Sequence, residues 1–175
     1  MTQPAPNNPV VELETSRGSI KIELFPEQAP LTVANFLTYV KEGFYDGLIF
    51  HRMISNALIQ AGGHGPGMVY KEPTHPSIKN EANNGLSNER GAIAMARAYP
   101  VDSAAAQFFI NVVDNTDLDY KGPEPQDHGY AVFGRVIDGM EVVDKMTWIP
   151  TGAVGEHRNV PQENIIIEKA SVIKE

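Results

Sequence analysis

Residues 50–63 read Phe-His-Arg-Met-Ile-Ser-Asn-Ala-Leu-Ile-Gln-Ala-Gly-Gly, with two short apolar runs on either side of a polar pair. Both runs have the length of strands, and Ser55-Asn56 suits a tight turn, so this stretch predicts a β-hairpin. Each run carries one planar side chain with several donors, Arg52 and Gln60. A guanidinium in an apolar strand is costly unless it is paired or lies at the edge of a cleft. A lone arginine usually lies on the polar face of a strand, but a second donor across the turn favours a site.

The chain before this hairpin predicts a second hairpin and a helix. Residues 10–14 and 20–24 alternate between apolar and polar side chains, which is typical of strands with one buried face. Pro30 suits the first turn of a helix, and Gly43 suits its end. Between them lies an apolar stripe at helical spacing, formed by Val33, Phe36, Leu37 and Val40.

After the hairpin, strands and long irregular segments follow one another with one short helix at residues 139–146. The predicted strands lie at residues 91–96, 107–113, 130–137 and 165–173, and residues 62–90 and 114–129 show no period. These elements do not alternate as βαβ units must. The sequence therefore predicts a mainly antiparallel barrel or sandwich whose ends are covered by helices.

Length and composition indicate one soluble domain. The chain has 175 residues, and we expect a disordered N-terminal tail at residues 1–9 and a single domain at residues 10–175. The net charge of −8 argues against nucleic-acid binding, and the lack of cysteine excludes disulfides and thiolate nucleophiles. Neither a signal peptide nor an apolar span is present, so no membrane partner and a cytoplasmic location are expected.

Three other kinds of chemistry fit the sequence less well. The glycines at positions 62, 63, 65 and 67 match neither standard phosphate-loop spacing. The five histidines show no spacing typical of metal ligands, so no metal site is predicted. Ser103 follows Asp102 but has no nucleophile-elbow motif around it, and a hydrogen bond within a loop is its simpler role.

Six blocks in the correct order resemble the cyclophilin family of peptidyl-prolyl isomerases, most closely its cytoplasmic bacterial branch. The blocks are Phe50-His51-Arg52, Gln60 with Gly62-Gly63, Ile78-Lys79-Asn80-Glu81, Met95-Ala96-Arg97, Gln107-Phe108-Phe109-Ile110 and Val132-Phe133-Gly134. The resemblance extends from about Val10 to the C-terminus. It implies an eight-stranded antiparallel closed β-barrel capped by two α-helices, and an enzyme that rotates X-Pro peptide bonds without a cofactor.

The resemblance also implies a role for individual residues. Arg52 matches the catalytic arginine of the family, and Gln60 matches the glutamine that holds the substrate. Phe109 would form the floor of the proline pocket, with Leu58 and Leu118 as its walls. For Phe109 and Leu118, an ordinary place in the core is the alternative.

Further family positions fall on the edges of the expected groove. Ala96 and Arg97 would offer main-chain groups to an extended peptide, Gln107 would orient Arg52 or the substrate, and Tyr130 occupies a position where many relatives have histidine. Two positions depart from the family pattern, since Ala57 and Asp117 stand where aromatic residues are usual. A wider and wetter proline pocket would follow, with weak binding of cyclosporin.

Three functions are therefore compared. The first is a monomeric prolyl isomerase that acts on proline-containing peptides and folding polypeptides and so assists protein folding. The second is a proline-peptide-binding or chaperone-like module with weakened catalysis. The third and least favoured is a hydrolase that uses Ser103 or His128.

Overall fold

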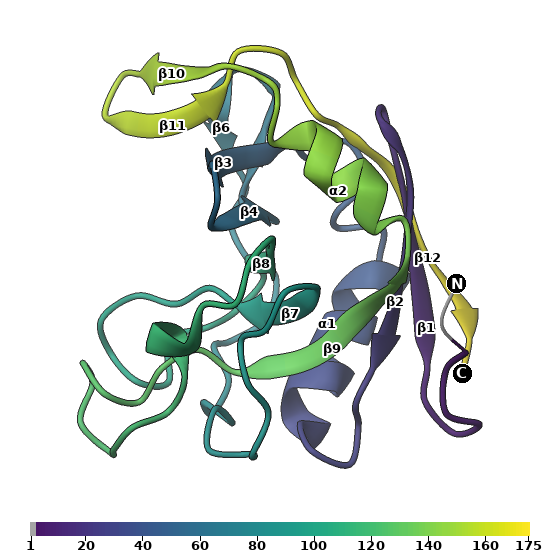
Figure 1. The fold of residues 1–175 in the computed structure, drawn as a ribbon, viewed down its shortest axis with the longest axis vertical. Coiled ribbons are helices and arrows are strands. Elements are labelled where there is room, and N and C mark those ends of the chain that lie inside the picture. The colour runs from purple at the N-terminus through teal and green to yellow at the C-terminus, as the bar shows by residue number, and fades with distance from the viewer. Residues whose placement is uncertain (1–2) are drawn as a thin grey trace.

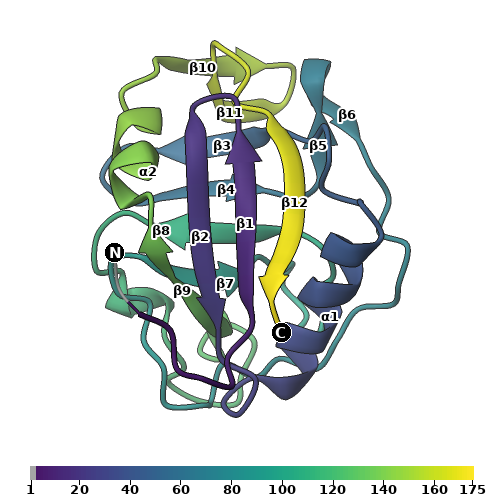
Figure 2. The ribbon, with the colours of Figure 1, turned by 90° about the vertical axis from the view of Figure 1, so that its right-hand side faces the viewer.

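One eight-stranded antiparallel sheet forms the framework of the protein. The computed structural model describes residues 3–175. The strands follow the order β12 (Ile167–Lys174), β1 (Val10–Thr15), β2 (Gly18–Leu24), β9 (Val132–Asp138), β7 (Ala92–Met95), β8 (Phe108–Asn111), β4 (Leu58–Ala61) and β3 (Phe50–Ile54). The sheet curls on itself, so that β1, β2 and β12 cross in front of β3, β4, β7 and β8 (Figure 2). The main core lies between these two layers, and the mainly β architecture expected from the sequence is confirmed.

The barrel is open along one seam, which corrects the expectation of a closed barrel. The edge strands β3 and β12 are not neighbours in the sheet. Within residues 3–175, a single bridge joins Ile49 and Ile166, which directly precede the two strands. Hydrogen bonds from Phe50 N to Ile165 O, from Ile167 N to Leu48 O and from Gly47 N to Ile167 O accompany this bridge. Because the two strands cross instead of running side by side (Figure 2), they share hydrogen bonds only near the crossing.

Two helices cover the barrel, as the periodicity predicts (Figure 1). Helix α1 (Pro30–Lys41) begins at its proline and buries Val33, Phe36 and Val40. Its buried face also includes Thr32 and Tyr39, whereas Leu37 of the predicted stripe is only half-buried. Helix α2 (Met140–Met146) buries Val143 and Met146.

The hairpin β3–β4 forms as predicted, with Asn56 in the left-handed conformation (φ 59°) that a tight turn tolerates for asparagine. Two small hairpins were not predicted from the sequence: β5 (His64–Gly65) pairs with β6 (Val69–Tyr70), and β10 (Thr151–Val154) pairs with β11 (His157–Pro161). Two 3₁₀ turns, η1 (Pro66–Met68) and η2 (Thr116–Leu118), lie in the irregular segments. The strands of the first hairpin are two residues long, and β10 has no buried residue, so neither shows a period.

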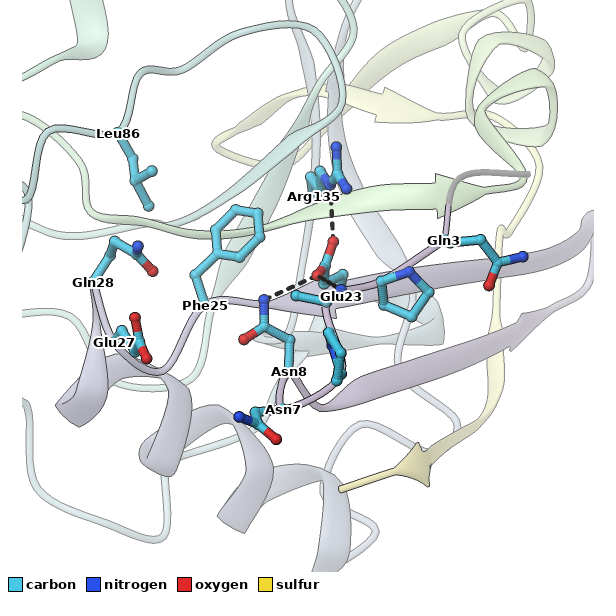
Figure 3. A pocket seen from close by; sticks show the side chains of 12 residues that line it. Gln3, Asn7, Asn8, Glu23, Phe25, Glu27, Gln28, Leu86 and Arg135 are labelled. Atoms are coloured by element: carbon cyan, nitrogen blue, oxygen red, sulfur yellow. Dashed lines mark hydrogen bonds and ion pairs between the residues drawn. The ribbon is translucent and has the colours of Figure 1, made fainter.

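The N-terminal segment is bound to the barrel through Glu23. This buried carboxylate of β2 accepts hydrogen bonds from Ala5 N (2.7 Å), Asn8 Nδ2 (2.9 Å) and Arg135 Nε (2.9 Å), as Figure 3 shows. Lys174 Nζ donates to the carbonyls of Ala5 and Asn8. Residues 5–8 of the expected disordered tail are thus hydrogen-bonded to β2 and β12, while residues 1–2 of that tail lie outside the described residues. The segment and β2 border a cavity of about 650 Å³.

Candidate active site

A row of directly opposite residues crosses the outer face of the sheet. Arg52 of β3 faces Gln60 of β4, Gln60 faces Phe109 of β8, and Phe109 faces Ala94 of β7. Side chains at paired positions lie on the same face of a sheet. The strand register therefore brings a guanidinium, an amide and an aromatic ring together, although they are far apart in the sequence.

Hydrogen bonds fix the polar end of this row. Arg52 Nη1 donates to Gln60 Oε1 at 3.1 Å, and Gln60 Nε2 donates to Gln107 Oε1 at 2.9 Å. Because each amide accepts at its oxygen and donates at its nitrogen, the chain Arg52–Gln60–Gln107 has one consistent direction. This chain orients the guanidinium without a carboxylate partner.

Gly63 leaves room for the end of this chain. A Cβ atom at this position would lie 2.4 Å from Gln107 Nε2 and 2.5 Å from its Cδ. Only a glycine lets the Gln107 side chain occupy its observed place. This role of Gly63 was not predicted from the sequence, although a glycine beside a strand is a known sign of close approach.

The apolar end of the row is a pocket of about 420 Å³. Phe109 is buried, and its ring meets the Tyr130 ring edge-on at a centroid distance of 5.7 Å. These rings belong to a small apolar cluster that is separate from the main core and includes Leu58, Ala96 and Leu118. The pocket is lined by Arg52, Ile54, Leu58, Gln60, Ala96, Arg97, Phe109, Leu118 and Tyr130.

Eight of the ten residues predicted from the sequence line this pocket, and two do not. Gln107 lines the adjacent hollow, and Ala57 packs against the apolar cluster without lining the pocket. The wall includes Ile54, which sequence reasoning missed. Ile54 lies two residues after Arg52 in the same strand, so alternation alone would have placed it on the same face.

A second hollow of about 320 Å³ continues from the first. The two share Gln60, Ala96 and Arg97. Beyond these residues, the second hollow is bordered by Tyr70, Pro73, Ala98, Ser103, Ala105, Ala106 and Gln107. Together the two hollows form one continuous groove.

The groove is positively charged on a protein of net charge −8. Arg52 and Arg97 border it, and no carboxylate lines either hollow. Within the described residues, neither arginine lies within 4 Å of a carboxylate oxygen. Behind Arg52, burial lowers the pKa of His51 to about 3, helped by the nearby His64, His157 and Arg52. His51 is therefore neutral at pH 7.

The structure does not arrange Ser103 or His128 for hydrolysis. The Ser103 hydroxyl bonds to backbone atoms of Ala98 and Pro100, and the His128 ring packs against Tyr120. Within residues 3–175, no group of three His, Asp or Glu side chains is placed to hold a metal ion. In the same part of the chain, no helix is long and apolar enough to cross a bilayer.

The fold and the groove together define a β-barrel protein with an apolar pocket beside an oriented guanidinium. Residues 10–172 match the family model described as cyclophilin type peptidyl-prolyl cis-trans isomerase/CLD. The chain belongs to this family, as the resemblance of the six sequence blocks implied.

Individual relatives agree with this assignment. The chain is 53% identical to peptidyl-prolyl cis-trans isomerase B of Escherichia coli, over 93% of this chain and 99% of that protein. It is 50% identical to the isomerase cyp18 of Streptomyces antibioticus, over 93% and 98%. Among solved structures, a cyclophilin type isomerase of Cryptosporidium parvum, crystallised in the presence of the dipeptide Ala-Pro, superposes with a TM-score of 0.79 at 28% identity, covering 95% of this chain and 99% of the other.

Proposed function

We propose that this chain catalyses rotation about X-Pro peptide bonds in polypeptides, with Arg52 as the catalytic donor. The observation that carries the proposal is the guanidinium of Arg52 at the rim of the apolar pocket whose floor is Phe109. A proline ring in this pocket brings the bond on its nitrogen next to the guanidinium.

The chemistry needs no bond to be formed or broken. Rotation about a peptide bond has a barrier of about 18–20 kcal/mol because it interrupts amide resonance. As the amide twists, its nitrogen becomes pyramidal and regains a lone pair. A donor aimed at that lone pair stabilises the transition state more than the planar ground state, which is the condition for catalysis.

Arg52 suits this role because it stays charged and has five N–H groups. The bond to Gln60 uses one of these groups and sets the plane of the fork. The others can donate to the proline nitrogen and to the neighbouring carbonyl. Gln60 is proposed to hold the substrate, and Gln107 to orient Gln60.

We expect the apolar pocket to bind the ring of a substrate proline with modest affinity. Ile54, Leu58 and Leu118 are its aliphatic lining, and the positions that usually carry aromatic residues in the family are Ala57 and Asp117. An aromatic side chain buries about 150–250 Å², so its absence reduces contact with a bound ring. We expect cyclosporin to bind weakly, and a titration that gave nanomolar affinity would contradict this.

Exchange of an X-Pro peptide, followed by NMR line shapes, tests the proposed activity. The wild type should broaden the cis and trans signals at catalytic amounts of protein. Arg52→Ala should lose about three orders of magnitude in kcat/KM, because the donor to the twisted amide is removed. At about 1.4 kcal/mol for each tenfold change, this loss corresponds to about 4 kcal/mol of transition-state stabilisation. Arg52→Lys should recover little, since lysine lacks the planar fork.

The same experiment gives a different result if the chain is a proline-peptide-binding module without catalysis. If both the wild type and Arg52→Ala bind the peptide without exchanging it, the chain is a proline-peptide-binding module and the proposed activity is wrong. A role in assisting protein folding, a cytoplasmic location and a monomeric state stay predictions from the sequence.

A further inference from the structure

The side chain of Arg97 connects two loops that border the groove. Its Nε donates to Ala98 O (3.1 Å) and its Nη2 to Tyr99 O (2.9 Å), both in the loop that follows β7. Its Nη1 donates to Gly129 O (2.8 Å) and its Nη2 to Pro125 O (2.6 Å), both in the loop that precedes Tyr130. One guanidinium thus binds four backbone carbonyls, two from each loop.

A residue that lines the proline pocket lies at each end of the second loop. Leu118 precedes the loop and Tyr130 follows it, and Tyr130 N donates to Leu118 O at 3.0 Å. Gly129 has a φ of 76°, and a Cβ there would lie 2.6 Å from Leu118 O. Arg97 therefore binds the carbonyl of Gly129, the residue whose backbone sets the position of Tyr130.

Arg97 also lies close to the Tyr130 ring. The centre of the guanidinium is 5.6 Å from the ring centroid, within the range of a cation–π contact. The Tyr130 ring also meets the Phe109 ring edge-on. Arg97 thus touches the wall of the pocket directly and also through the backbone.

We propose that Arg97 is a positioning residue that sets the width of the proline pocket by holding the wall of Leu118 and Tyr130 against the edge at Ala96. This inference rests on the proposed function, and it gives the Arg97 side chain a role in addition to the main-chain contact with an extended peptide that the family resemblance implies. A lysine cannot replace the arginine, because a single ammonium cannot reach four carbonyls in two loops.

The loop keeps other attachments when Arg97 is removed. Asn80 Nδ2 also donates to Gly129 O (3.1 Å) and to Val101 O (3.2 Å), and the loop has internal bonds such as His128 N to Glu124 O. We therefore expect Arg97→Met to fold, with the wall displaced or more mobile but still present.

The test separates KM from kcat for an X-Pro peptide. Arg97→Met should raise KM about tenfold, the size typical of losing one well-packed contact in a binding site, and change kcat less than about twofold because Arg52 is untouched. Arg97→Lys should show most of the same rise. In a Tyr130→Ala background, Arg97→Met should add little further change in KM, since residues that act through one another are not additive.

Arg90→Met provides the matched control. Arg90 also joins distant parts of the chain, since it donates to Val112 O and forms an ion pair with Asp144, but it does not line the groove. Its loss should lower the melting temperature and leave KM unchanged. An unchanged KM in Arg97→Met, an equal rise in Arg90→Met, or a full additional rise in the Tyr130→Ala background would each overturn the proposal.

The same variants distinguish this proposal from the proposed function. If the wild type fails to exchange the peptide, the isomerase activity is wrong, and the dissociation constant of the proline peptide then replaces KM as the readout. A rise of that constant in Arg97→Met alone supports the role of Arg97, and an unchanged constant overturns it.

Discussion

Individual side chains in the groove are held by neutral partners. Arg52 is oriented by Gln60, Gln60 by Gln107, and Gln107 fits because position 63 has no side chain. A carboxylate beside Arg52 would orient it more strongly, but it would also compete with the substrate for the guanidinium. Amide partners fix the direction of the donors and leave their charge available to the substrate.

Gly63→Ala tests this chain of contacts. The new Cβ would displace the Gln107 side chain and break its bond to Gln60, so we expect kcat/KM to fall about tenfold. The cost in the free energy of unfolding should stay below about 1 kcal/mol, because the atom that must move belongs to a flexible side chain. Urea denaturation and the exchange assay measure the two effects separately.

Gly65→Ala is the control for this prediction. The nearest atom to a Cβ at that position is Val69 O at 4.0 Å, and Gly65 has an ordinary φ of −93°. Its activity should equal that of the wild type. Comparable activity losses in the two variants would show that the Gln107 position is unimportant.

At the scale of elements, a row of three imidazole rings links β3 to the two small hairpins. His51 belongs to β3, His64 to β5 and His157 to β11. The ring centroids of His51 and His64 lie 4.3 Å apart, and those of His64 and His157 lie 5.1 Å apart. The Nδ1 atoms of His51 and His64 are buried without a hydrogen-bond partner in the described residues, so a proton on either ring would be poorly accommodated.

These histidines make the stability of the protein depend on pH. Burial lowers the pKa of both His51 and His64, to about 3 for His51, from an ordinary value of 6.5. Below pH 6.5 the unfolded chain takes up protons that the native state does not, so stability is complete above this pH and falls as the pH decreases toward 3. For His51 alone the loss between pH 7 and pH 5 is about 2 kcal/mol.

Urea unfolding at pH 7 and at pH 5 measures this effect. His51→Gln should show a smaller difference between the two pH values than the wild type, and His64→Gln provides a second variant if the first folds poorly. The carboxylates with a lowered pKa, Glu23, Glu42 and Asp144, lose their stabilising effect mainly below pH 4.5 and contribute only a small part of the loss in this window. Equal stability of the wild type at both pH values would contradict the prediction.

The hairpin β3–β4, helix α1 and the strands of the barrel could be predicted because each has one buried face and a clear period. The hairpins β5–β6 and β10–β11 could not, since their strands are short or exposed and their stability comes from packing on β3. Most residues that line the proline pocket could be predicted from the family blocks, but the width of the pocket could not. The contacts of Arg97 with Pro125 and Gly129 join residues about thirty positions apart, and nothing in the local sequence signals them.

For the whole molecule, the distribution of charge separates the groove from the rest of the surface. The net charge is −8, yet Arg52 and Arg97 border the two hollows, and no carboxylate among residues 3–175 does. Two unit charges about 4 Å apart attract by about 1 kcal/mol in water and more where water is partly excluded. The groove is therefore expected to select among peptides by charge.

Peptides that differ only in the residue before proline test this selection. We expect a Glu-Pro peptide to have a KM about three- to tenfold lower than a Lys-Pro peptide, with a Gln-Pro peptide between them. Because exposed charges are screened at high ionic strength, the difference should shrink at about 0.5 M salt. A preference for the lysine peptide, or one that salt does not alter, would count against it.

The pairing of β1 with β12 places Val10 opposite Lys174, and both strands lie on the side of the barrel away from β3, β4 and β8 (Figure 1). A segment attached to the end of either strand therefore extends from the side of the barrel that is opposite the groove. A tether, a tag or a neighbouring domain attached there would leave the groove accessible to bulky clients. The architecture is suited to work as an insert between two other segments, with its entry and exit side by side.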